Sequence, residues 1–201
     1  MADLTIQVAS ASDASELLAI YSPYVTHTAI TFEYEVPSVA EFAGRIEKIL
    51  TRHPFIVAKR DNKLIGYAYA SAFKDRAAYD WAVEVSIYIV QNERGSGVGK
   101  ALYAKLETIL KVMGVLNLNA CIGVARPNDE YLNDASVHFH ERLGYEMVGE
   151  FRQCGFKFGR WYNMIWMQKM IGEHTSAPAK VRKFSELSEE NLGEILNNLQ
   201  N

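Results

Sequence analysis

The stretch QNERGSGVGKALYAKLETIL, residues 91–110, sets an arginine and three glycines in front of an amphipathic helix. The run WAVEVSIYIV, residues 81–90, comes directly before it and has the composition of a strand. Apolar residues at helical spacing predict that the helix spans 98–113: Leu102, Leu106, Ile109, Leu110 and Met113. The stretch therefore predicts a strand, a bare turn and a helix.

The bare turn has the features of an anion site. The first turn of a helix carries unpaired backbone N–H groups and the positive end of the helix dipole. Glycines let a ligand approach those N–H groups without a Cβ in the way, and flanking cations add donors. The turn therefore predicts a phosphate cradle made of Arg94, Gly95, Ser96, Gly97, Val98, Gly99 and Lys100. The alternative is a flexible turn with two surface cations.

Two known phosphate motifs do not fit this turn. A P-loop needs Ser or Thr after its lysine, and Ala101 follows Lys100 here. A dinucleotide-binding motif needs G-x-G-x-x-G and an acid on the next strand, whereas this turn reads G-x-G-x-G. The next strand, LNLNACIGV, has no acidic residue.

Outward from this unit, strands and helices mix in an α+β order. Gly144 ends the helix that follows the fifth strand. The predicted strands are 4–9, 55–60, 64–73, 81–90, 116–124, 145–152 and 160–170. The predicted helices begin at a cap on Ser12 or Asp13, at a cap on Ser38, at Val98 and at Asn133.

Two connections are also predicted. Residues 28–38 are β-rich but contain Pro37, which favours a loop with a short strand. A turn through Gly155 and Gly159 joins the last two strands. Residues 1–171 form the predicted domain, and 172–201 form a polar tail with a possible short helix through Leu192, Ile195, Leu196 and Leu199. We expect the tail to be loosely docked or disordered.

Composition sets the compartment and excludes some classes of partner. The formal net charge of −3 gives no reason to expect a nucleic-acid partner. No apolar run is long enough to span a bilayer, and no export signal is visible, so we expect a cytoplasmic protein without a membrane partner. Cys121 and Cys154 form no metal-like or redox pair and are expected to be reduced thiols.

Three motifs resemble one known family. The R-x-x-G-x-G run from Arg94 to Gly99 resembles the pyrophosphate motif of the GNAT superfamily of acyl-CoA-dependent N-acetyltransferases, and NDASVHFHERLGY, residues 133–145, resembles its later helix. KDRAAYDWAVEVSIYIV and HERLGY are similar to the phosphinothricin acetyltransferase subfamily, which also acetylates methionine sulfone and sulfoximine. The resemblance covers about residues 4–170. ARPNDEY, residues 125–131, looks like a small insertion.

The resemblance implies a fold and a reaction. It implies the α/β/α layered GNAT fold, with a mixed, mostly antiparallel twisted sheet. It also implies acetyl transfer from acetyl-CoA to the α-amino group of a small amino-acid-like acceptor, in a ternary complex without a metal. No cysteine stands in a nucleophile context, which favours direct transfer. The subfamily also implies a homodimer, and the aromatic strands near the C-terminus would suit one.

Glu84 is the candidate general base. In strand 81–90 it shares one face with Ser86 and Tyr88. Burial in so apolar a strand would raise its pKa toward a value useful for taking a proton from an ammonium group. The alternative is a solvent-facing strand glutamate, and the match to the subfamily favours the base.

Other roles come from the resemblance. Backbone groups of Ile87, Tyr88 and Ile89 are expected to bind the pantetheine of CoA. Asn133 is a helix cap and an expected CoA contact. His140 is expected to protonate the leaving thiolate or to assist proton transfer; the alternative is an ordinary helix histidine. His138 and His140 lie two residues apart on a helix, so they do not form a metal pair.

The acceptor side is also assigned by resemblance. Arg76 and Tyr79 match positions that hold the acidic groups of the acceptor, and an arginine can bind a carboxylate through two hydrogen bonds. Thr31, Phe32 and Glu33 lie in the loop that covers the acceptor in this subfamily. The alternatives are a surface arginine in a loop and, for the phenylalanine, a core residue.

Three other functions remain open on the sequence alone. The acceptor could be a different amine, such as a polyamine, a peptide N-terminus or an antibiotic, although Arg76 would repel a polycation. A non-catalytic acyl-CoA-binding module would keep the cradle but would need neither Glu84 nor His140. A nucleotide-binding protein could use the same glycine turn.

Overall fold

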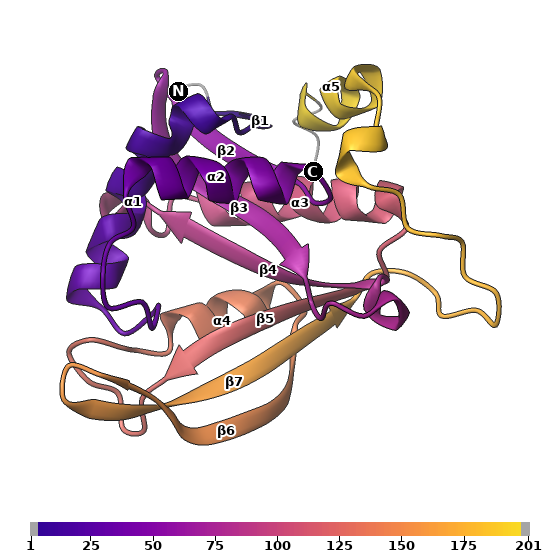
Figure 1. Ribbon diagram of the computed structural model, residues 1–201. Helices are drawn as coiled ribbons and strands as arrows, with labels where there is room; N and C mark the ends of the chain where they lie inside the picture. The colour runs from indigo at the N-terminus through magenta and orange to yellow at the C-terminus, as the bar shows by residue number, and fades with distance from the viewer. Residues whose placement is uncertain (1–3, 198–201) are drawn as a thin grey trace.

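The computed structural model describes residues 4–197. Its centre is one seven-stranded sheet in the order β1-β2-β3-β4-β5-β7-β6 (Figure 1). All neighbouring strands are antiparallel except β4 and β5, which are parallel. The predicted mixed, mostly antiparallel sheet is thereby confirmed. The strands are β1 Leu4–Val8, β2 Phe55–Arg60, β3 Lys63–Ala72, β4 Ala82–Ile89, β5 Asn117–Val124, β6 Glu146–Lys157 and β7 Arg160–Met170.

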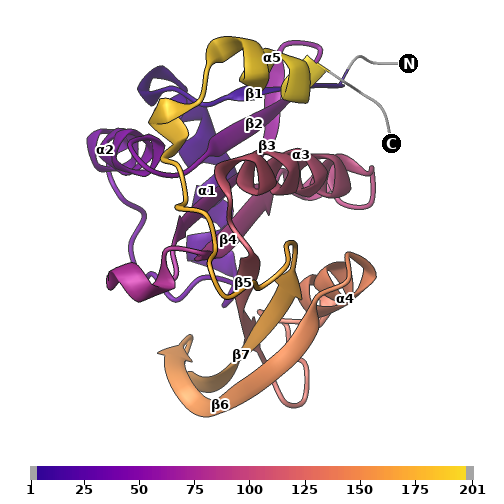
Figure 2. The ribbon, with the colours of Figure 1, turned by 90° about the vertical axis from the view of Figure 1, so that its right-hand side faces the viewer.

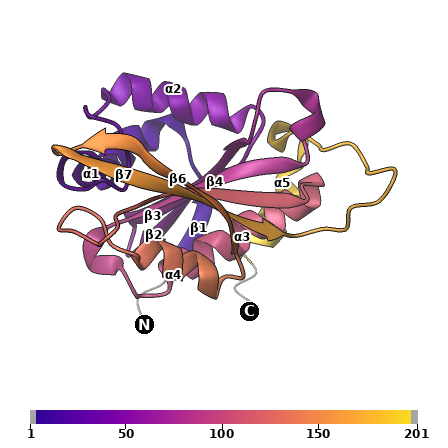
Figure 3. The same cartoon turned by 90° about the horizontal axis from the view of Figure 1, so that it is seen from below.

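Helices cover both faces of the sheet, so the predicted layered architecture is also confirmed. Seen from below, α1 and α2 lie on one side of the strands, and α3 and α4 lie on the other (Figure 3). One apolar cluster includes Leu17 and Ile46 from the first pair of helices. The other includes Leu102 and Leu106 of α3. The helices are α1 Ala14–His27, α2 Val39–Leu50, α3 Val98–Met113, α4 Ala135–Arg142 and α5 Glu189–Asn197.

The sheet is split between its two parallel strands. β4 and β5 pair only from Ala82↔Asn117 to Glu84↔Asn119. Beyond Glu84, β4 continues alongside β3, and β5 continues alongside β7. The two strands therefore diverge like a V, as Figure 1 shows. Their facing edges carry backbone N–H and C=O groups that the ladder between them does not use.

Several predicted boundaries need correction. Ser38 caps α2 as predicted, since its hydroxyl accepts the N–H of Glu41 at 3.2 Å. Asp13, one of the two predicted caps, does occupy the N-cap position of α1, but its side chain makes no capping hydrogen bond to that helix. Asp13 instead accepts the N–H of Ser10 at 2.8 Å, which stabilises a short 3₁₀ turn, Ala11–Asp13, before the helix.

Two connections also differ from the sequence prediction. Residues 28–38 form a loop as predicted, but they contain no strand. Gly155 lies inside β6 rather than in a turn. The turn to β7 is made by Phe158 and Gly159, both with positive φ, at 51° and 73°. Glycine occurs here both inside the strand, at Gly155, and in the turn, at Gly159. The sequence pattern therefore does not show at which glycine the strand ends.

The tail packs on the domain within the described residues. Phe184 and Leu187 are buried in the same apolar cluster as α3. Figure 2 shows α5 beside β1 and α3. The Trp81 indole also donates to the carbonyl of Ala179 at 2.8 Å. The tail is thus docked, while Leu199 of the predicted helix lies outside the described residues and the division at residue 171 stays a prediction. None of the helices in the described part has the length and apolar character to cross a bilayer.

Candidate active site

A cleft lies between the diverging ends of β4 and β5. Ser86 and Tyr88 lie on the β4 face that packs toward α1 and α2, whereas Tyr103 and His140 come from α3 and α4 on the opposite side of the sheet. The cleft therefore passes through the sheet. Its lining comprises Ile30, Val85, Ser86, Ile87, Tyr88, Tyr103, Ala120, Cys121, Ile122, Gly123, Leu132, Ser136 and His140.

The glycine turn forms the start of α3, as predicted. Gly97 is the N-cap with φ of 86°, and Gly95 has φ of 80°. A Cβ at either glycine would project into open space. The next N–H groups belong to the first helical turn, which has no preceding turn to accept them. The turn therefore offers accessible backbone donors in a conformation that favours glycine.

The flanks of the turn are held by tertiary contacts. Glu93 forms an ion pair with Arg60 of β2. The Ser96 hydroxyl donates to the carbonyl of Glu93 at 2.7 Å. The Arg94 guanidinium lies 5.4 Å from the centre of the Tyr24 ring. These contacts hold the turn in place.

Gly99 is required for packing, because a side chain at this position would meet its neighbours. A Cβ there would lie 3.0 Å from Cδ1 of Ile89 and 3.1 Å from Cε2 of Phe139. Glycine at this position therefore lets α3 approach the end of β4 and the side of α4. Its role differs from that of Gly95 and Gly97, whose open sides face solvent.

The structure limits the part of the β4 edge that can bind a ligand. The Tyr24 hydroxyl donates to the carbonyl of Ile89 at 2.5 Å and accepts its N–H at 3.3 Å. The Ile89 backbone is therefore engaged, in contrast to the prediction that it binds pantetheine. Residues 85–88 remain as the β4 lining of the cleft.

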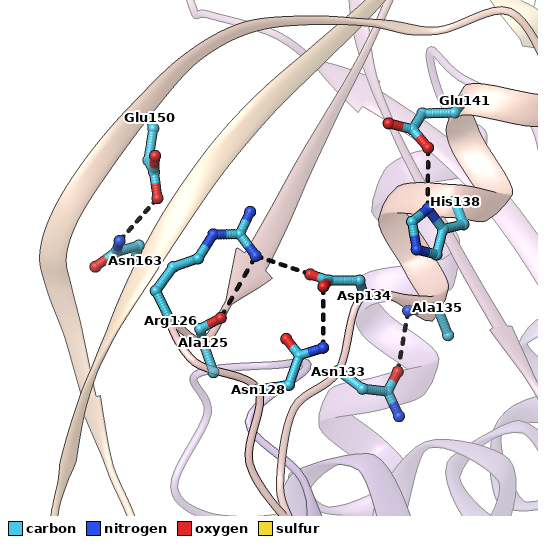
Figure 4. A network of polar contacts seen from close by, with 10 residues as sticks. All are labelled: Ala125, Arg126, Asn128, Asn133, Asp134, Ala135, His138, Glu141, Glu150 and Asn163. Atoms are coloured by element: carbon cyan, nitrogen blue, oxygen red, sulfur yellow. Dashed lines mark hydrogen bonds and ion pairs between the residues drawn. The ribbon is translucent and has the colours of Figure 1, made fainter.

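Asn133 lies at the entrance to α4 (Figure 4). Its Oδ1 accepts the N–H of Ala135 at 3.0 Å, but the N-cap position of α4 is Asp134, one residue after the predicted cap. Figure 4 shows its amide nitrogen turned away from the neighbouring polar network. In that network Asp134 pairs with Arg126 at 2.9 Å and accepts a hydrogen bond from Asn128. The residues that resembled an insertion thus brace the start of α4.

Glu84 lies where β4 and β5 separate. It is the last β4 residue in register with β5, opposite Asn119. Burial raises the pKa of Glu84, and the charge of Lys74 opposes that rise. The sequence predicted the raised pKa but gave no role to Lys74, whose ammonium lies 5.0 Å from the ring centre of Phe73 and 5.8 Å from that of Trp166.

His140 and Tyr103 form a buried pair on the cleft wall. His140 Nδ1 lies 2.7 Å from the carbonyl of Ser136, so Nδ1 carries the proton of the neutral ring. The Tyr103 hydroxyl then donates to Nε2 at 3.1 Å. Burial lowers the pKa of His140 and raises that of Tyr103 well above its usual value. Sequence reasoning missed Tyr103, although it lies one helical turn after Gly99.

The loop 28–38 covers the side of the cleft that faces α1 and α2. Its Thr31 hydroxyl lies 2.9 Å from the Tyr21 hydroxyl, and its carbonyl accepts from the Lys157 ammonium at 2.7 Å. Phe32 packs directly on the backbone of Gly155. It also lies 3.5 Å from the Cβ position of Gly123, a residue of the cleft. Thr31 and Phe32 therefore fix the loop at the rim of the cleft.

Glu33 has one paired and one unpaired carboxylate oxygen. Oε1 accepts from the Arg45 guanidinium of α2 at 2.7 Å. Oε2 is buried, and within residues 4–197 it has no hydrogen-bond partner. Arg45 was not predicted as a site residue, because nothing in the sequence brings α2 over this loop.

Arg76 and Tyr79 do not join the cleft in this structure. Both are exposed on the turn between β3 and β4. Tyr79 packs on Phe73 with ring centres 6.0 Å apart, and Arg76 forms no ion pair within the described residues. Lys74, two residues before Arg76, is the cation whose charge reaches Glu84.

Comparison with known proteins agrees with this geometry. The sequence model of the acetyltransferase (GNAT) domain matches residues 6–166. A phosphinothricin N-acetyltransferase of Streptomyces viridochromogenes is 31% identical over 90% of this chain and 95% of its own. An L-methionine sulfoximine/L-methionine sulfone acetyltransferase of Pseudomonas aeruginosa is 31% identical over 87% and 98%. The crystal structure of a GNAT superfamily phosphinothricin acetyltransferase from Sinorhizobium meliloti in complex with AcCoA has a TM-score of 0.80 and 38% identity, covering 88% of this chain and 93% of its own.

The chain belongs to the GNAT acetyltransferase family. This confirms the family predicted from Arg94–Gly99 and the later helix. It also confirms the predicted class of enzyme, an acyltransferase, and acetyl-CoA as the co-substrate.

Proposed function

We propose that this enzyme transfers the acetyl group of acetyl-CoA to the α-amino group of a small amino-acid-like acceptor of the phosphinothricin, methionine sulfone or methionine sulfoximine type. The observation that carries the proposal is the cleft through the sheet, with Glu84 where the strands part and the glycine turn following the end of β4. The names of the relatives support the acceptor class.

The cradle and the β4 edge would bind CoA. The N–H groups that begin α3, with Arg94 and Lys100, suit the pyrophosphate. Backbone groups of residues 85–88 would hold the pantetheine where the sheet is split, and the amide nitrogen of Asn133 offers a further contact. The thioester would then lie in the cleft, with its carbonyl close to a β4 backbone N–H that can stabilise the oxyanion.

Glu84 would accept the proton that the acceptor ammonium must lose. Its raised pKa brings it nearer to neutrality, which is the condition for an efficient base. The freed amine then attacks the thioester carbon, and the C–S bond breaks as the tetrahedral intermediate collapses. Glu84 acts directly or through one water.

Tyr103 would serve the leaving thiolate, with His140 as its positioning partner. The Tyr103 hydroxyl can turn from Nε2 of His140 to give its proton to the sulfur. When the tetrahedral intermediate collapses to the amide, the attacking nitrogen loses a proton. That proton replaces the one that Tyr103 has given to the sulfur. Because burial lowers the pKa of His140, its ring stays neutral and keeps an acceptor for the hydroxyl. This refines the predicted role of His140.

We infer direct transfer in a ternary complex, because the cysteine in the cleft is a poor nucleophile. Cys121 lines the cleft, but burial raises the pKa of its thiol to about 12, with Glu84 adding to the rise. A thiol of such pKa supplies almost no thiolate at neutral pH, so it is a poor acyl acceptor. The attacking group is therefore the amine of the acceptor.

The experiment is an acceptor panel with a thiol-release readout. Purified protein is mixed with acetyl-CoA and, in turn, phosphinothricin, methionine sulfone, methionine sulfoximine, ordinary amino acids and spermidine. We expect thiol release that depends on an amino-acid acceptor, together with an acetylated product of the expected mass. Release with the polyamine alone, or binding of CoA with no acceptor-dependent turnover, would overturn the proposal.

We also infer a homodimer through the β6–β7 face. This hairpin exposes several large apolar side chains, an arrangement typical of an interface: Met147, Val148, Phe151, Phe156 and Trp161. Light scattering coupled to gel filtration should give twice the chain mass, and Trp161→Glu should give the monomer mass. A wild-type monomer would contradict this. The cytoplasmic location and the absence of nucleic-acid and membrane partners stay predictions.

A further inference from the structure

The unpaired oxygen of Glu33 is unusual for a folded protein. Buried polar atoms almost always have a hydrogen-bond partner. Within residues 4–197, Oε2 of Glu33 is the one buried side-chain nitrogen or oxygen without one. A carboxylate oxygen can only accept a hydrogen bond, so the missing partner is a donor.

Glu33 is held in place on the acceptor side of the sheet. Arg45 fixes Oε1 at 2.7 Å. The loop that carries it is fixed by the Tyr21–Thr31 contact and by the Lys157 ammonium on the carbonyl of Thr31. The loop is therefore held by two contacts of Thr31, and the carboxylate itself is oriented by one ion pair, whose Arg45 and Glu33 side chains are 45% and 35% exposed.

Glu33 and Glu84 lie near the same tyrosine. Tyr69 of β3 is paired with Ser86 of β4, a residue that lines the cleft. Burial is the main cause of the raised pKa of Tyr69, a hydrogen bond with Ser86 opposes it, and the charges of Glu84 and Glu33 add smaller rises. The geometric link to the cleft is Phe32, the neighbour of Glu33, which lies 3.5 Å from the Cβ position of the cleft residue Gly123. An acceptor in the cleft with its amine at Glu84 would then extend its far end toward this loop.

We propose that Glu33 is a specificity residue that accepts a hydrogen bond from an N–H group at the far end of the acceptor side chain, with Arg45 as its positioning residue. This rests on the proposed function. The acceptor class is therefore an amino acid with a distal N–H donor, such as a sulfoximine. A distal sulfone or phosphinate offers only acceptor oxygens. These cannot donate a hydrogen bond to Oε2 of Glu33 and would be repelled by it.

Methionine sulfoximine and methionine sulfone provide the test, because they differ by one N–H in place of an oxygen. A site built to accept a hydrogen bond rejects the analogue that lacks the donor. We expect the wild-type enzyme to favour the sulfoximine by about tenfold or more in kcat/KM. Glu33→Gln, whose amide can both donate and accept, should bring the ratio close to one while leaving the KM for acetyl-CoA unchanged.

Two variants separate this role from a structural one. Arg45→Gln removes the ion pair but keeps the carboxylate, so KM should rise for both acceptors while the sulfoximine remains favoured. Glu35→Gln changes an exposed acid in the same loop and should leave the ratio as in the wild type.

The outcomes distinguish the inference from the proposed function. If neither compound is acetylated and phosphinothricin is not acetylated either, the proposed function fails; if phosphinothricin alone is acetylated, the proposed function stands and the role of Glu33 is refuted. If both are acetylated with equal kcat/KM, or if Glu33→Gln keeps the wild-type preference, the role of Glu33 is refuted. A fall of both rates by the same factor in Glu33→Gln would likewise refute it and make Glu33 a structural residue.

Discussion

Replacing Gly97 with alanine separates backbone strain from ligand binding in the cradle. Gly97 has φ of 86°, a conformation that costs an alanine about 1–2 kcal/mol. For a protein of about this size, each kcal/mol lowers Tm by roughly 2–4 °C, so we expect a fall of roughly 2–8 °C. A Cβ at this position meets no protein atom within 4 Å, so no packing clash adds to the strain.

The same open space is where the pyrophosphate would lie, so the methyl group should also weaken acetyl-CoA binding. A hydrogen bond to a charged group contributes about 1.5–3 kcal/mol. Loss of one backbone–phosphate bond should therefore raise the Kd for CoA by about 10- to 150-fold. Calorimetry with CoA measures this directly, and thermal unfolding in the absence of CoA measures the strain.

Gly159 provides the matched control. It also has positive φ, at 73°, and open space around its Cβ position, but it lies in the β6–β7 turn. Gly159→Ala should lower Tm by a similar amount and leave the Kd for CoA unchanged. Equal Kd values for Gly97→Ala, Gly159→Ala and wild type would refute the assignment of residues 94–100 as the cradle.

Three further predictions follow from buried groups. Glu84→Gln should lower kcat by about 10²- to 10⁴-fold. It should also raise the free energy of unfolding at neutral pH. Burial raises the folded-state pKa of Glu84, so the stabilising contribution of this residue is lost as pH rises through that value. Denaturant unfolding of both proteins across pH measures this difference in stability, and an unchanged kcat would mean that Glu84 is not the base. Tyr103→Phe should lower kcat by at least about tenfold with little change in the KM for acetyl-CoA, measured by steady-state kinetics; a rise in KM alone would make Tyr103 a binding residue. Phe184→Ala should cost about 3–5 kcal/mol in urea unfolding, since Phe184 is only 6% exposed, whereas Phe184→Leu should cost under about 1.5; equal small losses would mean that the tail contributes little.

Local signals in the sequence were sufficient for the strand, the glycine turn and the helix, and for the face of β4 that carries Glu84. The strand, the glycine turn and the helix follow one another directly in the chain. Their composition alone therefore predicts which structure each segment forms. Period-two alternation placed Glu84 on the face opposite the α3 core, and the structure agrees, since Val83 and Val85 belong to the cluster around α3.

Pairings between distant elements were not available from the sequence. Tyr103 and His140 are 37 residues apart and meet only because α4 packs beside α3. Glu33 and Arg45 meet because α2 folds over the loop before it. Arg76 was expected at the acceptor, but the turn between β3 and β4 leaves it exposed.

The sequence by itself determined the glycine turn and the start of α3, because glycines and an amphipathic helix act through neighbouring peptide groups. Only the tertiary structure decided where β4 and β5 part, since their pairing depends on contacts between segments more than 30 residues apart. It also decided which buried groups have partners, and so left one oxygen of Glu33 without a donor among residues 4–197. Burial and hydrogen bonding are properties of the packed chain, and no local pattern contains them.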